Sequence, residues 1–239
     1  MDKPLKGKKA LVTGGTRGIG QAIAQRLHAD GAEVWITGVT AGPATRGPMH
    51  YRAVELSNRA ATEEFAREVE QLGFDILVNN AGINTNNPFS AIKLADFDSI
   101  HEVNVRSAFR LCQAVLPAMR RAGWGRIVNI ASIFSVISKE HRATYSASKF
   151  ALDGLTAGLA AEVAVEGILA NCVSPGFIET DLTRKNLGEQ GIRELVALVP
   201  MRRLGQPAEV AALVAWLAGP QNTFISGQNI VIDGGFTRV

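Results

Sequence analysis

The octapeptide Thr13-Gly14-Gly15-Thr16-Arg17-Gly18-Ile19-Gly20 decides how the chain begins to fold. An apolar run at residues 9–13 leads into it, and an amphipathic stretch at residues 19–29 follows it. Three of its glycines, spaced G-x-x-x-G-x-G, allow the backbone to turn tightly and to approach a phosphate group. A helix that starts there presents free N–H groups and the positive end of its dipole to that anion. The octapeptide therefore predicts a strand, a nucleotide-binding turn and a helix.

Short apolar runs and longer amphipathic stretches alternate along the rest of the chain. The pattern predicts strands at residues 9–13, 33–37, 51–54, 75–79, 126–131, 168–174 and 229–232, and helices at 19–29, 58–72, 95–122, 143–166 and 207–218. Strands that are almost continuously apolar indicate a parallel sheet that is covered on both faces. We therefore expect an α/β fold with one Rossmann-type, doubly wound parallel β-sheet and helices on both faces. No linker or repeat divides residues 1–239, which predicts a single domain.

One connection departs from this alternation. Residues 38–50 contain three glycines and two prolines. Proline and glycine at this density leave no room for a regular helix. We expect a loop between the strands at 33–37 and 51–54.

Composition narrows the classes of partner. The net charge of +3 arises from basic residues that are scattered and form no stripe, so a nucleic-acid partner is not expected. No apolar stretch approaches the ~18 residues of a membrane span, and the start of the chain has no signal-peptide core. Cys112 and Cys172 lack metal-ligand spacing, which predicts two buried free thiols, a reducing compartment and no metal. These features predict a cytoplasmic protein.

Tyr145 and Lys149 lie four residues apart on the predicted helix at 143–166. Positions i and i+4 share one face of a helix, so the phenol and the ammonium should lie side by side. A neighbouring cation favours phenolate and lowers the pKa of tyrosine from its usual value of about 10. The pair is therefore a candidate proton-transfer centre. The alternative is a helical tyrosine and a solvated lysine at this spacing by coincidence.

Several motifs together identify a resemblance. The glycine spacing of the octapeptide, the run Asn79-Asn80-Ala81-Gly82 and the Tyr145/Lys149 pair resemble the short-chain dehydrogenase/reductase family. The resemblance covers essentially the whole chain, because it includes Asn104, Ser132, Pro175-Gly176 with Thr180, and Asp233-Gly234-Gly235. The run at residues 175–181 is most similar to that of the 3-oxoacyl-[acyl-carrier-protein] reductases.

The resemblance implies an NAD(P)H-dependent oxidoreductase that interconverts a ketone and a secondary alcohol. It assigns proton donation to Tyr145, a hydrogen bond to the reacting oxygen to Ser132, contact with the nicotinamide ribose to Lys149, and the holding of a relay water to Asn104. The residues that it implies for coenzyme binding are Gly14, Thr16, Arg17, Gly18, Ile19, Gly20, Asn80, Ala81, Gly82, Tyr145, Lys149, Pro175, Gly176, Ile178 and Thr180. A nucleotide-binding regulator without catalysis is the alternative, and the presence of all four catalytic residues favours the enzyme.

The coenzyme preference depends on the end of the strand at 33–37. An acid there would bind the ribose 2′-OH of NAD and repel a 2′-phosphate, and residues 37–40 contain none. Arg17 in the octapeptide and Arg46 in the loop could bind the phosphate, although either could be ordinary surface charge. NADP(H) is therefore favoured, and NAD(H) remains open.

The sequence constrains the identity of the substrate less than that of the coenzyme. By resemblance, residues 177–203 form a substrate lid, and the polar stretches at 84–87 and 139–142 could border the pocket mouth or be solvated loops. Ile133, Phe134 and Phe177 could line the pocket or belong to the core. Glu166 stands where a basic residue would help to dock an acidic acyl carrier. A 3-oxoacyl thioester and a sugar or other small polar alcohol both remain candidates.

The resemblance also implies an assembly. The predicted helices at 95–122 and 143–166 correspond to those that pair across subunit axes in the family. Small residues on the second helix, including Gly154 and Gly158, would allow close packing. A homotetramer or homodimer is expected, and the alternative is close packing within one subunit.

Overall fold

The computed structural model describes residues 3–239, without the side chains of Leu182 and Asn186. Its centre is an eight-stranded sheet with the strand order β3-β4-β2-β1-β5-β6-β7-β8. The strands are β1 (Lys9–Val12), β2 (Glu33–Gly38), β3 (Thr45–Arg46), β4 (Met49–Ala53), β5 (Ile76–Asn79), β6 (Gly125–Ile130), β7 (Ile168–Pro175) and β8 (Asn229–Ile232). All neighbours pair in parallel except β3 with β4. The chain winds outward from β1 in one direction and from β5 in the other, which confirms the predicted doubly wound sheet.

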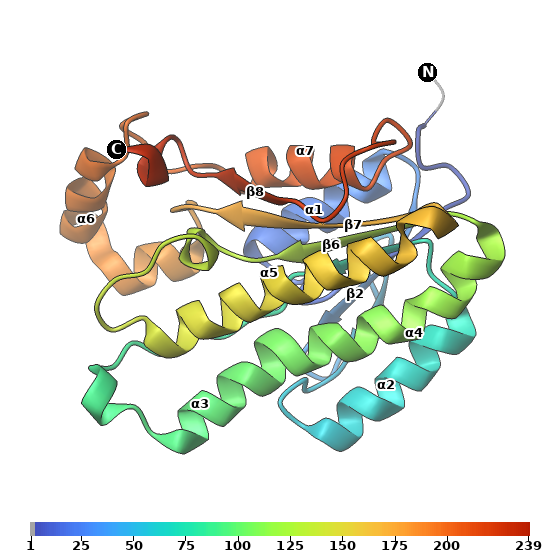
Figure 1. The fold of residues 1–239 in the computed structure, drawn as a ribbon, viewed down its shortest axis with the longest axis horizontal. Helices are drawn as coiled ribbons and strands as arrows, with labels where there is room; N and C mark the ends of the chain where they lie inside the picture. Colours follow the sequence, from blue (N-terminus) through green and yellow to red (C-terminus); the bar gives the residue numbers. More distant parts are fainter. Residues whose placement is uncertain (1–2) are drawn as a thin grey trace.

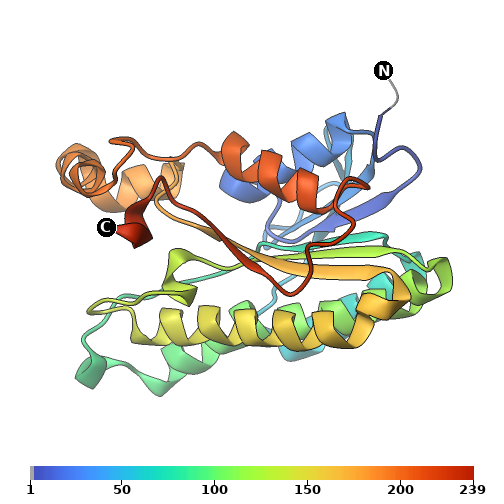
Figure 2. The same cartoon turned by 45° about the horizontal axis from the view of Figure 1, so that its top comes forward.

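Helices cover both faces of this sheet (Figures 1 and 2). They are α1 (Gly18–Ala29), α2 (Arg59–Leu72), α3 (Leu94–His101), α4 (Ser107–Ala122), α5 (Ala143–Val163), α6 (Asp181–Leu198) and α7 (Pro207–Leu217). One face carries α1 and α7, and the opposite face carries α2, α4 and α5. Among the described residues, no helix combines the length and apolar character that a membrane crossing requires.

Alternation along each strand separates the core into two layers. Val12 and Ile76 face the layer that α1 and α7 complete, where Ile23 and Val214 are fully buried. Leu11 lies in the other layer, together with the apolar side chains of α2, α4 and α5. Because both faces are apolar, the strands have the nearly continuous apolar sequence from which the parallel sheet was predicted.

The loop predicted at residues 38–50 contains no helix, as expected, but it includes the short strand β3. Thr45 and Arg46 pair antiparallel with the start of β4, which begins at Met49 rather than at the predicted Tyr51. The Tyr51 hydroxyl donates to the Thr40 carbonyl at 2.5 Å. This hairpin brings the loop back over the carboxyl end of β2.

The helix predicted at residues 95–122 is divided. A π-helical segment, Glu102–Arg106, separates α3 from α4, although the three continue as one rod (Figure 1). Pro117 lies inside α4, so the helix tolerates it. π-Helical turns of this kind occur mainly within α-helices at functional positions.

Candidate active site

The turn after β1 contains glycines that other residues could not replace without strain or a clash. Gly14 and Gly18 have φ angles of 63° and 55°, a region that favours glycine. A Cβ atom on Gly20 would lie 2.4 Å from both the Gly14 carbonyl oxygen and Asn80 Nδ2. Arg17 precedes α1 without a side-chain cap, so the N–H groups of the first turn are free for another acceptor.

The run after β5 holds this turn in shape. Asn80 Nδ2 donates to the carbonyl oxygens of Thr13 at 2.9 Å and Gly14 at 3.2 Å. The Thr13 hydroxyl accepts from the backbone N–H groups of Asn80 and Ala81, both at 3.0 Å. The sequence analysis did not identify Thr13 as part of the site. A threonine that ends a buried strand next to a glycine turn was its only signal.

The segment after β7 meets the same turn. A Cβ atom on Gly18 would lie 3.5 Å from Thr180 Cγ2. Thr180 also caps α6, because its hydroxyl accepts from the Thr183 N–H at 3.2 Å. Gly176 lies against Asp233, to whose Cβ an added Cβ would approach within 2.7 Å. Three of the segments predicted to bind coenzyme therefore converge at the carboxyl ends of the strands.

These residues fit a dinucleotide. The free N–H groups at the start of α1 suit a pyrophosphate, and the glycines let that group approach the backbone. The opening lies at the carboxyl end of parallel strands, next to the point where strand order reverses between β1 and β5. In the described part of the chain, no three His, Cys, Asp or Glu side chains gather to hold a metal ion.

Tyr145 and Lys149 lie together in the first turns of α5, as predicted from their spacing. Lys149 Nζ is 5.6 Å from the centre of the Tyr145 ring. The ammonium is buried and donates to the Ile130 carbonyl oxygen at 2.8 Å. Burial lowers the pKa of Lys149 to about 8, so the group stays mostly charged at neutral pH.

The predicted effect of Lys149 on Tyr145 is wrong for this structure. The pKa of Tyr145 is raised, because burial disfavours the phenolate. A hydrogen bond with Ser132 and the charge of Arg142 oppose this shift only in part. The hydrogen bond that Lys149 donates goes to the Ile130 carbonyl and not to the phenol. Tyr145 is therefore a protonated phenol at neutral pH.

Ser132 follows β6 and lies next to Tyr145. Its hydroxyl accepts from the Phe134 N–H at 3.2 Å and caps the 3₁₀ turn Ile133–Ser135. Ser135 donates to the Ser132 carbonyl oxygen at 2.6 Å and bonds the Ser174 hydroxyl at 2.9 Å. The backbone of Ser132 is thus held by a buried polar network that was not predicted from the sequence.

Asn104 occupies the π-helical segment and faces the same opening. Its Oδ1 accepts from the Ile83 N–H at 2.9 Å, while its Nδ2 donates to the Ile83 carbonyl at 3.0 Å and the Ser148 hydroxyl at 3.0 Å. A Cβ atom on Gly82 would lie 3.4 Å from Asn104 Oδ1 and 3.6 Å from Lys149 Nζ. Asn104 and Lys149 therefore border one space above Gly82. The water that Asn104 would hold stays a prediction.

Removing the Asn104 amide should lower stability. An Asn104→Ala variant leaves the N–H and C=O of Ile83 without their partner, so we expect the free energy of unfolding to fall by about 1–3 kcal/mol. Asn84→Ala is the matched control, because the Asn84 amide donates to the exposed Asn86 side chain. Urea unfolding of both variants tests this, and equal stabilities would contradict the structural role of Asn104.

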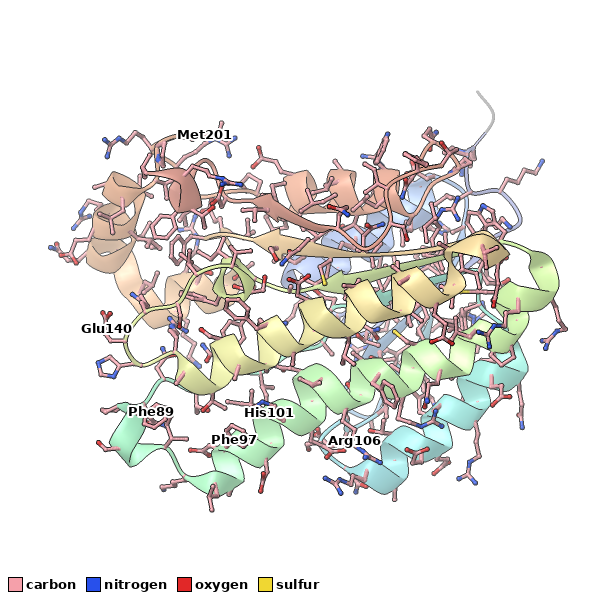
Figure 3. The ribbon with its side chains drawn as sticks, in the orientation of Figure 1. Phe89, Phe97, His101, Arg106, Glu140 and Met201 are labelled. Carbon is pink, nitrogen blue, oxygen red and sulfur yellow. The ribbon has the colours of Figure 1, made fainter. Side chains whose placement is uncertain are left out.

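The polar stretches predicted to border a pocket face each other. Asn86, Pro88 and residues 139–142 line a cleft of about 340 Å³. Figure 3 places Glu140 on the loop that leads into α5, at the same end of the molecule as Phe89. Ile133 and Phe134 are buried.

Phe177 packs edge-on against Phe236, with the two ring centres 5.0 Å apart. The Phe177 ring therefore packs against another aromatic ring of the same chain.

Known proteins match this chain over nearly its full length. A family model described as enoyl-(acyl carrier protein) reductase matches residues 14–237. Nodulation protein G from Rhizobium sp. (strain N33) is 39% identical, and the match covers 98% of this chain and 99% of that protein. A 3-oxoacyl-[acyl-carrier-protein] reductase from Vibrio cholerae is also 39% identical, with the same coverage.

A solved structure agrees with these matches. The gluconate 5-dehydrogenase from Burkholderia cenocepacia, in complex with NADP and tartrate, superposes with a TM-score of 0.92 at 33% identity. The match covers 100% of this chain and 98% of that one. The chain therefore belongs to the short-chain dehydrogenase/reductase family of NAD(P)-dependent oxidoreductases.

Proposed function

We propose that this protein reduces a ketone to a secondary alcohol with NADPH, and that Tyr145 supplies the proton. The observation that carries the proposal is the convergence of Ser132, Tyr145 and Lys149 beside the glycine turn. Asn104 joins them through the space above Gly82. The remaining residues of the turn and of the segments after β5 and β7 would hold the coenzyme.

The side chains have separate tasks in the reaction. When bound, the nicotinamide coenzyme supplies the hydride. Tyr145 carries a proton at neutral pH, because burial raises its pKa, and donates it to the carbonyl oxygen as that oxygen gains charge. The Ser132 hydroxyl donates a hydrogen bond to the same oxygen. Lys149 would bind the ribose hydroxyls, and Asn104 would resupply the proton through its water.

Two arginines support NADP(H) over NAD(H). Arg17 is exposed at the start of α1. The guanidinium carbon of Arg46 lies 4.1 Å from the centre of the Tyr51 ring, and a Cβ atom on Gly38 would lie 3.0 Å from the Tyr51 hydroxyl. The hairpin thus holds Arg46 beside the end of β2, where a 2′-phosphate would be recognised. NAD(H) remains the second candidate.

Neutralising these arginines should weaken NADPH selectively. In Arg17→Gln and Arg46→Gln variants, we expect the KM for NADPH to rise about tenfold to a hundredfold, because each loses a charged hydrogen bond to the phosphate. The KM for NADH should not change. Arg67→Gln, which removes an exposed arginine from α2, serves as the control. An equal rise for both coenzymes would contradict phosphate recognition.

Two substrate classes have support. The 3-oxoacyl thioesters are supported by the relative from Vibrio cholerae. A sugar or other small polar alcohol is supported by the gluconate 5-dehydrogenase and by the charges at the end of α4. There Arg120 already pairs with Glu166 at 2.6 Å and Glu162 at 3.7 Å, which leaves less positive charge for an acidic carrier protein.

NADPH oxidation with a substrate panel tests the proposal. The panel contains a 3-oxoacyl group on its carrier protein, the same group on N-acetylcysteamine, ketosugars and 2,3-butanedione. We expect turnover of at least one ketone, with no advantage for the carrier-bound thioester over the small one. A strong preference for the carrier-bound form would favour the acyl-carrier function and exclude the small polar class.

Two further expectations of the proposal concern the domain organisation and the lid. The continuous sheet from β1 to β8 supports a single domain. Residues 177–203 would form the lid, because α6 lies beyond the carboxyl ends of the strands (Figure 1) and Gly188 interrupts its helical backbone. The side chain of Leu182, which the sequence analysis places in this lid, lies outside the described residues.

Exposed apolar side chains support the expected assembly, and the two cysteines support the expected compartment. Phe109 of α4, together with Phe150 and Leu155 of α5, exposes apolar surface that would pair with a second subunit in a homodimer or homotetramer. Cys112 and Cys172 are both free and buried, which supports a reducing compartment such as the cytoplasm.

A further inference from the structure

Arg142 stands next to the reacting group without a role in the proposed mechanism. It immediately precedes α5, three residues before Tyr145. Its guanidinium carbon lies 5.2 Å from the centre of the Phe134 ring. The same ring meets Tyr145 edge-on, with ring centres 6.1 Å apart. Phe134 therefore contacts both a cation and the proton donor.

The guanidinium of Arg142 lacks the partner that comparable arginines have. Four arginines of the described chain are at least partly buried, and three of them donate to acceptors, namely Arg52 to Glu68, Arg110 to Glu63, and Arg126 to the carbonyls of Gly125, Gly167 and Asn222. The guanidinium of Arg142 has no hydrogen bond and no carboxylate within 4.0 Å among the described residues. Its nitrogens are not sealed from solvent, so a ligand can reach them.

A partly buried guanidinium without a carboxylate partner favours an anionic ligand. Guanidinium carries five N–H donors, and partial burial removes water that would otherwise accept from them. A carboxylate matches two of these donors in a planar, bidentate arrangement. Burial lowers the pKa of Arg142 from its very high usual value but leaves it protonated at neutral pH. The charge needed to bind an anion is thus present.

The cleft beside Arg142 is basic on balance. Lys139, His141 and Arg142 line it, with Glu140 as the one acid on the same loop. Asp96 belongs to a neighbouring group of residues that also includes His141. Figure 3 shows Glu140 at the outer edge of this loop. Arg142 is the lining residue of this cleft that also contacts Phe134, the ring packed against Tyr145.

We propose that Arg142 binds a carboxylate of the substrate, so that the ketone reduced by this protein is an oxo acid and the alcohol a hydroxy acid. This inference rests on the proposed function and narrows its small polar class. The reaction is otherwise unchanged. The carbonyl carbon gains a hydride from NADPH, its oxygen gains the Tyr145 proton, and the products are the hydroxy acid and NADP⁺.

Binding a carboxylate would also adjust the proton donor. The charge of Arg142 lowers the pKa of Tyr145, in opposition to burial. A carboxylate on Arg142 offsets that charge. The phenol is then held more firmly in the protonated form that reduction requires.

Matched acid and amide substrates test the proposal. We choose 2-oxobutanoate with 2-oxobutanamide, and 4-oxopentanoate with 4-oxopentanamide, and measure kcat/KM for the wild type, Arg142→Gln and Arg121→Gln. Each pair shares a carbon skeleton and differs in charge. Arg121→Gln removes an exposed arginine from the far end of α4. Turnover of neutral 2,3-butanedione reports separately on the proposed carbonyl reduction.

We expect the wild type to prefer the acid in at least one pair. For that acid, Arg142→Gln should lower kcat/KM about tenfold to a hundredfold, mainly through KM, while the amide and 2,3-butanedione keep their rates. Arg121→Gln should change neither. Equal use of acid and amide by the wild type, or an equal loss on both in Arg142→Gln, would overturn the proposal. If no ketone at all is reduced, the proposed function fails and the inference fails with it.

Discussion

A Tyr145→Phe variant is expected to lose about 10²- to 10⁴-fold in kcat, the usual contribution of a positioned proton donor. The substitution removes one oxygen and keeps the ring that packs edge-on against Phe134. The turn after β1 keeps its own hydrogen bonds in this variant. The Kd for NADPH should therefore change far less than kcat, and the free energy of unfolding should fall by no more than about 1 kcal/mol for the lost bond to Ser132.

The chain offers a matched control, because Tyr51 is its only other tyrosine. Its hydroxyl donates to the Thr40 carbonyl in the hairpin, far from Ser132 along the sheet. Tyr51→Phe should keep the wild-type kcat at saturating NADPH. Full activity of Tyr145→Phe, or an equal loss in both variants, would remove Tyr145 from the mechanism.

A Gly20→Ala variant should bind NADPH about tenfold to a hundredfold more weakly, since overpacking a tight site costs about 1–3 kcal/mol. The new Cβ would lie 2.4 Å from both the Gly14 carbonyl oxygen and Asn80 Nδ2. Either the turn opens or Asn80 loses its bonds to Thr13 and Gly14. Both outcomes displace the N–H groups that would face the pyrophosphate.

Fluorescence titration with NADPH measures this loss. Glu70→Ala is the control, because it changes an exposed side chain of α2. It should leave the Kd unchanged and favour the helix slightly. An unchanged Kd in Gly20→Ala would mean that the turn after β1 does not hold the coenzyme.

The fold could be predicted because its signals are local. Buried parallel strands are apolar on both sides, so Leu11 and Val12 adjoin in sequence although they face opposite core layers. Tyr145 and Lys149 could be paired because four residues form one helical turn. The glycine turn was recognisable because its G-x-x-x-G-x-G spacing lies between a predicted strand and a predicted helix.

The features that were not predicted depend on contacts between segments that are distant in the sequence. The π-helical segment at Asn104 was predicted as ordinary helix, because the bonds of Asn104 to Ile83 and Ser148 that accompany it join distant parts of the chain. The hairpin of β3 was predicted as loop, because its pairing with β4 involves only two residues on each side.

The pKa of Tyr145 was predicted in the wrong direction. Spacing reveals the neighbouring ammonium, but not the burial that outweighs it nor the carbonyl of Ile130 to which that ammonium turns. The open guanidinium of Arg142 is likewise invisible in a sequence, since it depends on which carboxylates lie near in space.

Reduction of a ketone with NADPH distinguishes this site from a surface that only binds a nucleotide. The most direct measurement follows NADPH oxidation and alcohol formation together, for wild type and Tyr145→Phe, across the ketone panel. We expect one alcohol for each NADPH consumed by the wild type and almost none from the variant. Tight binding of NADPH without turnover of any ketone would instead identify the protein as a nucleotide-binding regulator.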